Sequence, residues 1–261
     1  ALTVDGNAVA STNATSTFGL GDGTGAVTVG NGATINATAA VTGTASATST
    51  DATANTSATV SDGTVTGINL ANLTVGNSGS LTARGISSQT ASAATVEDPG
   101  SAGNGAAATV ASGDDIRGID STVVQVGNDV SALNVSASLT GSATASNVNG
   151  ASSALAGEGS TAVALNSSNT TVGDTLVNGA LFAAASSLTS FATSVGTSAT
   201  AASGNSAAVT GVDTSNLTIG GNAGTVSAQA SSTLASTATT SGSLAGTATT
   251  AKDRKSTRLN S

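Results

Sequence analysis

The chain lacks several of the side chains on which most proteins depend. Its 261 residues include no Cys, Met, Trp, Tyr or His, only 3 Phe and only 1 Pro. Without cysteine there is no disulfide framework and no cysteine-based metal site. Without His, Cys and Tyr, the usual general bases and nucleophiles reduce to carboxylates, a few basic groups and unactivated hydroxyls. We therefore expect no enzyme, and we predict no catalytic, cofactor-binding or metal-binding residues.

Charge is also scarce. Charged residues make up 8% of the chain, and the formal net charge is −8. Arg84 and Arg117 stand alone, and the other basic residues lie within residues 252–258. Nucleic-acid binding needs basic residues spread over one face, so we expect no nucleic-acid partner. No run of 18 apolar residues occurs, so we expect no membrane insertion.

What the sequence does contain is a repeated phrase of valine or isoleucine followed by glycine. The glycine-to-glycine spacings are 46, 51, 46 and 47 residues. A period of this length is typical of repeat architectures, in which one supersecondary unit is copied along the chain. The five copies are Val29-Gly30, Val75-Gly76, Val126-Gly127, Val172-Gly173 and Ile219-Gly220.

The segments around each phrase alternate between apolar and polar residues. After Gly30, alternate positions from Ile35 carry mostly alanine, valine and glycine, while the others carry mostly Thr, Ser and Asn. A period of two predicts a strand with an apolar and a hydroxyl face. We also predict strands over 67–75, 118–126 and 211–219, shorter apolar strands over 58–60 and 108–110 before turn glycines Gly63 and Gly113, a strand variant over 180–192, and bulges at Ile86 and Leu188.

These strands predict an all-β fold. A repeat of about 47 residues filled mostly with alanine buries too little apolar surface to fold alone, so the repeats must share one core. We expect an elongated β-solenoid of about five repeats, each making about two coils, with residues 1–252 forming a single repeat array. The alternative is a series of tandem small β-sandwich repeats.

The last nine residues, 253–261, differ abruptly in composition. They resemble the conceptual translation of a short-read sequencing adapter, and such scars are set aside before a fold is considered. We expect this segment to be an artefactual tail, and residues 1–252 to be a metagenomic fragment of a longer chain. The alternative is a basic tail that ends the domain.

Two groups of carboxylates deserve consideration as sites. The pairs Glu97–Asp98 and Asp114–Asp115 lie in Gly- or Pro-containing turns, and we predict that both pairs are solvated. Residues 19–25 superficially resemble glycine-aspartate calcium repeats, although the phrase occurs once. Calcium is thus a possible cofactor, with Asp22 and Asp62 as the first residues to test.

The hydroxyl face suggests a function of its own. Thr-x-Thr steps resemble those of hyperactive ice-binding solenoids, in which a flat threonine array orders water. In the sequence the steps recur irregularly and are mixed with Ser, Asn and Gln, and Thr favours strands for packing reasons alone. The steps are Thr42-Gly43-Thr44, Thr48-Ser49-Thr50, Thr64-Val65-Thr66, Thr237-Ala238-Thr239 and Thr247-Ala248-Thr249.

In composition and repeat style, residues 1–252 resemble the Thr/Ser/Ala/Gly-rich β-repeat proteins of microbial surfaces and phage fibres. The resemblance implies a structural repeat module of an extracellular fibre, adhesin stalk or surface filament, without catalysis. Its partners would be copies of itself or neighbouring repeats, and cell-surface glycans or a host receptor. Two alternatives stay open, an ice-binding protein with a Thr-rich flat face and a disordered Ser/Thr-rich spacer.

Overall fold

The computed structural model describes residues 2–4, 7–13, 16–50, 54–61, 63–95, 103–110, 113–127, 132–172, 181–219, 225–240, 247–250 and 255–256. Every regular element in these ranges is a β-strand, as the alternating sequence predicts. None of the described residues belongs to a helix long and apolar enough to cross a membrane.

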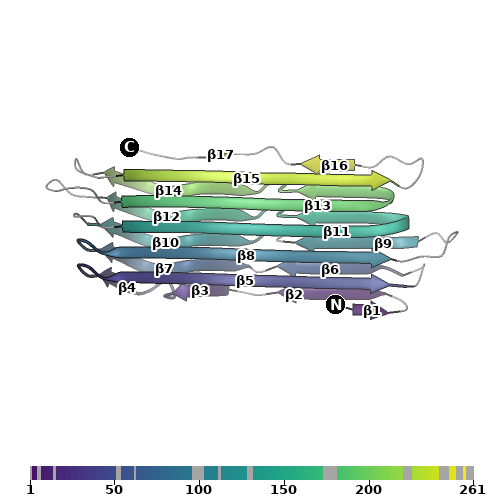
Figure 1. Ribbon diagram of the computed structural model, residues 1–261, viewed down its shortest axis with the longest axis horizontal. Coiled ribbons are helices and arrows are strands. Elements are labelled where there is room, and N and C mark those ends of the chain that lie inside the picture. Colours follow the sequence, from purple (N-terminus) through teal and green to yellow (C-terminus); the bar gives the residue numbers. More distant parts are fainter. Residues whose placement is uncertain are drawn as a thin grey trace.

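Five long strands lie side by side in one layer, which we call the front layer (Figure 1). Within each strand, side chains point alternately into the molecule and outward, and the inward positions carry mostly Ala, Leu and Val. The predicted strand over 180–192 is confirmed from Leu181 onward, where β13 begins, and residue 180 lies outside the described residues. The front layer consists of β5 (Thr34–Ser49), β8 (Ser80–Thr95), β11 (Ala132–Ala156), β13 (Leu181–Ser203) and β15 (Thr225–Thr240).

The chain returns behind the front layer through a back layer (Figure 1). Its main strands are β3 (Ser16–Leu20), β4 (Ala26–Val29), β7 (Thr64–Val75), β10 (Asp115–Val126), β12 (Thr161–Val172), β14 (Ala208–Ile219) and β17 (Lys255–Ser256). The remaining short strands are β1 (Leu2–Val4), β2 (Ala8–Asn13), β6 (Thr56–Ser61), β9 (Gly103–Val110) and β16 (Thr247–Thr250).

All strand pairs in the described residues are parallel, and equivalent positions of successive repeats pair with one another. They form a 10-stranded and a 7-stranded sheet. The first part of β11, up to Asn147, pairs with β8, whereas its last part, from Gly150, pairs with β9. Each repeat therefore runs out along the front layer and back along the back layer once.

This arrangement corrects the predicted architecture. The strands form parallel sheets in a nearly closed, barrel-like arrangement around a shared interior, so the prediction of an elongated β-solenoid is wrong, as is the alternative of tandem sandwiches. The prediction of two coils in each repeat fails because the long strands use up most of a repeat in a single circuit. The structure also gives no evidence for the classification as an adhesin or a fibre.

The back layer comes into close contact with the front layer at a row of glycines. A Cβ atom added to Gly67 would lie 2.6 to 2.7 Å from backbone atoms of Arg84, on the opposite layer. Gly211 faces Gln229 in the same way. This contact divides the interior into two hydrophobic clusters: one is rich in alanine, and the other contains larger side chains such as Ile68, Leu73, Leu81 and Phe182.

The interior is more polar than the sequence predicts. Burial alternates without interruption along β8, so Ile86 points outward, and Ser87 and Gln89 point into the core. In β13, Leu188 lies in phase with Phe182 and is also buried. The predicted bulges at Ile86 and Leu188 are therefore wrong, because the strand keeps its parity and accepts polar residues inside.

The repeated Val-Gly phrase marks the turn from the back layer to the front layer. Strands β4, β7, β10, β12 and β14 each end at the valine or isoleucine of the phrase. The N–H of Gly76 donates to the carbonyl of Val29 (2.7 Å), and the N–H of Gly127 donates to that of Val75 (2.7 Å). Gly173 and Gly220 lie outside the described residues. The phrase thus links successive turns through backbone hydrogen bonds.

This contact predicts different effects of one substitution at two equivalent positions. A Cβ atom at Gly76 would lie 2.9 Å from the carbonyl oxygen of Val29, whereas nothing lies within 4 Å of one at Gly30. We expect Gly76→Ala to lower the free energy of unfolding by about 1 to 2 kcal/mol. Gly30→Ala should change it by less than about 0.5 kcal/mol. Urea denaturation measures both, and equal effects would contradict the stacked-turn geometry.

Candidate functional site

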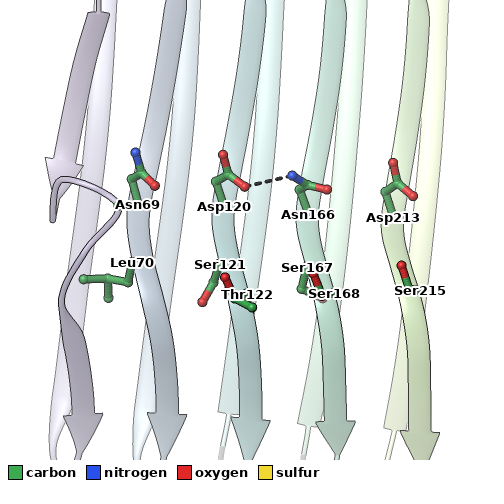
Figure 2. A pocket seen from close by; sticks show the side chains of 11 residues that line it. Asn69, Leu70, Asp120, Ser121, Thr122, Asn166, Ser167, Ser168, Asp213 and Ser215 are labelled. Carbon is green, nitrogen blue, oxygen red and sulfur yellow. Dashed lines mark hydrogen bonds between the residues drawn. The ribbon is translucent and has the colours of Figure 1, made fainter.

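A polar hollow crosses the outer surface of the back layer. It has a volume of about 460 Å³ and is lined almost entirely by polar side chains of β7, β10, β12 and β14. Figure 2 shows Asn69, Asp120, Asn166 and Asp213 side by side on these four strands. Neighbouring strands are about 4.8 Å apart, so these four residues form a ladder with that spacing.

A short motif at equivalent positions of β7, β10, β12 and β14 produces this ladder. It consists of a glycine, a branched apolar residue and then Asn or Asp, as in Gly67-Ile68-Asn69 and Gly118-Ile119-Asp120. The glycine permits the close contact with the front layer, and the apolar residue is buried in the core. The third residue then faces outward. In β12 the motif reads Ala164-Leu165-Asn166, so a methyl group replaces the glycine hydrogen there.

The hollow lies where the strands deviate from strict alternation. Ser121 is buried, but Thr122 is exposed and Val123 is only half-buried before Val124 returns to the core. The Ser121 hydroxyl donates to the carbonyl oxygen of Val123 (3.0 Å). Equivalent buried hydroxyls occur on the next strands, where Ser167 Oγ donates to Thr214 Oγ1 (3.1 Å). These hydrogen bonds stabilise the backbone and the buried hydroxyls beneath the hollow.

One arginine neutralises the middle of the ladder. Arg117 Nη2 lies 2.6 Å from Asp115 Oδ2, and Arg117 Nη1 lies 2.5 Å from Asp120 Oδ2. Burial disfavours the charged guanidinium, but the hydrogen bonds and charges of Asp115 and Asp120 outweigh it and raise the pKa of Arg117. Asn166 Nδ2 donates to Asp120 Oδ1 (2.8 Å) (Figure 2). Both carboxylate oxygens of Asp120 therefore have a partner within the protein.

The alternation of amide and carboxylate along the ladder predicts the effect of adding a negative charge to it. Asn166→Asp would place a third carboxylate between Asp120 and Asp213 on adjacent strands, and like charges directly opposite destabilise a sheet. We expect the free energy of unfolding to fall by about 1 kcal/mol at low salt and to recover at high salt. Asn169→Asp is the control, since Asn169 lies between Val123 and Asn216. Equal salt-dependent losses in denaturant titrations would contradict this interpretation.

The calcium candidates do not form a site among the described residues. Asp22 is fully exposed, and its Oδ1 accepts from the hydroxyl (2.7 Å) and the backbone N–H (3.1 Å) of Thr24. These bonds lower the pKa of Asp22. Asp62 lies outside the described residues. No group of three or more His, Cys, Asp or Glu side chains gathers in the described part of the chain in a way that could hold a metal ion.

The carboxylate pairs have different environments. Glu97 and Asp98 lie outside the described residues. Asp115 faces outward and binds Arg117, but Asp114 is 1% exposed, so the predicted solvated turn is wrong for Asp114. Its Oδ2 accepts from Gln89 Nε2, and its Oδ1 accepts from the N–H of Gly63 (3.3 Å). A buried carboxylate was missed because its amide partner is distant in the sequence.

The outer surface of the front layer carries two continuous columns of hydroxyls. One residue from each of the five long strands contributes to each column, because the parallel register aligns them. A third column between them begins with Thr44, Thr90 and Ser142 but continues with Phe191 and Ala235. The two hydroxyl columns are Thr42, Ser88, Thr140, Thr189 and Thr233, and Ser46, Ser92, Thr144, Thr193 and Thr237.

No protein-family model, no curated protein and no solved structure matches the chain. The function therefore has to be inferred from the two surfaces and from the repeat itself.

Proposed function

We propose that the chain is a structural repeat module, without catalysis, that serves as a spacer in an extracellular or surface-bound assembly. The observation that supports this proposal is the parallel, in-register pairing of successive repeats, in which each circuit forms its hydrogen bonds with the next. A fold of this kind gains stability from contacts between neighbours, so its length can change by whole repeats. The low content of charge and the hydroxyl-rich outer faces fit a solvated spacer.

Duplication of one repeat tests this proposal. Asp115 pairs with Thr161, so residues 115–160 make one circuit and can be inserted again after residue 160. We expect the longer chain to fold, to unfold at a higher urea concentration, and to extend the stack by about 4.8 Å, measured by small-angle scattering. An insertion that unfolds the protein, or a random-coil circular dichroism spectrum of the original chain, would contradict the proposal. The second result would favour the disordered spacer.

A second function, ice binding, is favoured by the hydroxyl columns of the front layer. The register aligns Thr-rich positions that are irregular in the sequence, so five strands offer hydroxyls at a constant spacing of about 4.8 Å. We expect thermal hysteresis in the purified protein if these columns order water into an ice-like lattice. Thr140→Tyr in the centre of one column should remove most of it, whereas Ser168→Tyr on the back layer should not. No hysteresis at millimolar protein would exclude this function.

A further inference from the structure

The hollow of the back layer contains polar groups that the protein itself leaves unused. Asp213, Thr122, Ser168 and Ser215 are exposed and line the hollow. None of these four side chains hydrogen-bonds or ion-pairs with another described residue, in contrast to Asp120, which binds both Arg117 and Asn166. One free carboxylate and three free hydroxyls therefore face solvent from three adjacent strands, within one concave surface.

The spacing of these groups limits what can bind to all of them. The strands β10, β12 and β14 are about 4.8 Å apart, so a ligand that crosses them meets a polar position at each such step. One pyranose unit of an extended linear oligosaccharide advances by a similar length. Sugar hydroxyls can donate to the carboxylate of Asp213 and exchange hydrogen bonds with Ser168 and Ser215.

Charge further narrows the class of ligand. Asp213 lies in the hollow, Asp22 lies near its rim beside Gly23, and the guanidinium of Arg117 is already bound by two carboxylates. An acidic ligand would meet repulsion from these carboxylates, and no Lys or Arg is among the described residues that line the hollow. A neutral or amino-bearing ligand would not be repelled by these carboxylates. An amino group would also gain a charge-assisted hydrogen bond to Asp213.

We propose that this hollow binds a linear oligosaccharide without acidic groups, laid across β10, β12 and β14 with about one sugar unit on each strand. Asp213 accepts a hydrogen bond from a hydroxyl or amino group of the sugar, and Ser168 and Ser215 bind the adjacent units. This binding site is additional to the structural role, and each can be tested without the other.

Isothermal titration with three hexasaccharides of matched length tests the proposal: cellohexaose, hexaglucosamine and hexagalacturonic acid. We expect the full chain to bind cellohexaose, hexaglucosamine or both, and to bind the acidic hexamer at least tenfold more weakly than the better of these. Asp213→Ala should weaken binding at least tenfold, the loss of one hydrogen bond to a charged group. Ser168→Tyr should fill the hollow and abolish binding. Thr140→Tyr, on the front layer, should leave it unchanged.

Three results would overturn the proposal. The first is that neither cellohexaose nor hexaglucosamine binds at millimolar concentration, although circular dichroism shows that the chain has β-structure. The second is equal binding of the acidic hexamer, which would remove the argument from charge. The third is binding that survives both Asp213→Ala and Ser168→Tyr, which would place the ligand elsewhere. The repeat-duplication experiment uses no sugar, so its outcome separates failure of the structural role from failure of this site.

Discussion

Gly67→Val is expected to lower the free energy of unfolding by about 3 kcal/mol or more. The reason is the close approach of the two layers, because a Cβ atom at position 67 would lie 2.6 Å from the backbone nitrogen of Arg84 and 2.7 Å from its carbonyl carbon and oxygen. Backbone atoms in a paired strand cannot move aside as a flexible side chain can. Equilibrium urea denaturation, followed by circular dichroism, measures the loss.

The chain offers a matched control at the equivalent position of β12. Ala164 is fully buried there, so this strand already accommodates a methyl group. Ala164→Gly should cost only about 1 kcal/mol, from the greater freedom of glycine in the unfolded chain and the lost methyl contact. If Gly67→Val changed the stability by less than about 0.5 kcal/mol, the layers would not meet at this position.

Gln89→Leu is expected to lower the free energy of unfolding by about 3 kcal/mol. Gln89 and Asp114 are each 1% exposed, and the amide Nε2 of Gln89 donates to Asp114 Oδ2 and to Ser87 Oγ (3.1 Å). Leucine has a similar volume but no donor, so the carboxylate would lose this hydrogen bond in the interior. Such a loss costs about 1 to 3 kcal/mol, and more for a charged group. Urea denaturation at pH 7 measures it.

The double variant Gln89→Leu/Asp114→Leu separates a lost hydrogen bond from a packing defect. When both partners become apolar, no charge is buried without its donor, and part of the lost stability should return. The double-mutant cycle should therefore give a coupling of at least about 1 kcal/mol. Additive losses would show that Gln89 does not stabilise Asp114.

The sequence predicts the strands well, because their signals are local. Alternation from Ile35 onward gives both faces of β5, and the apolar residue before each repeated glycine marks where a back strand ends. Gly63 and Gly113 adopt positive φ angles of 69° and 72°, as expected for turns between strands. Each of these features depends on neighbouring residues in the chain.

The register between repeats was harder to predict because the repeats differ in length. Thr42 pairs with Ser88, Ser88 with Thr140, Thr140 with Thr189, and Thr189 with Thr233, so the offset changes at every step. A search for Thr-x-Thr at a fixed spacing therefore misses the hydroxyl columns. The ladder of Asn69, Asp120, Asn166 and Asp213 differs, because each of its residues lies seven positions before a repeated glycine and its register follows the repeat. Its Gly-apolar-Asn/Asp motif predicted only the start of a back strand, since a local pattern does not show that the outward side chains line one hollow.

The architecture and the polar interior depend on contacts that the sequence does not encode locally. The number of strands in one circuit is set by where the chain reverses, and β11 and β13 each continue through a reversal without a break. Gln89 lies in β8, whereas Asp114 directly precedes β10, and only the packing of the layers brings the two side chains together. The glycine-containing turn around Asp114 predicted a solvated carboxylate, because the sequence does not show which layer covers that turn.

The central claim is that successive repeats pair in parallel, in register, with one circuit in each repeat. The natural chain contains no cysteine, so pairs of introduced cysteines test it directly. Thr140 pairs with Thr189, within the distance that a disulfide spans, while Thr193 lies four residues farther along the same strand. We predict that Thr140→Cys/Thr189→Cys cross-links under mild oxidation and that Thr140→Cys/Thr193→Cys does not, as measured by mass spectrometry of proteolytic fragments. Cross-linking mainly of the second pair, or no cross-linking of either pair, would contradict this register.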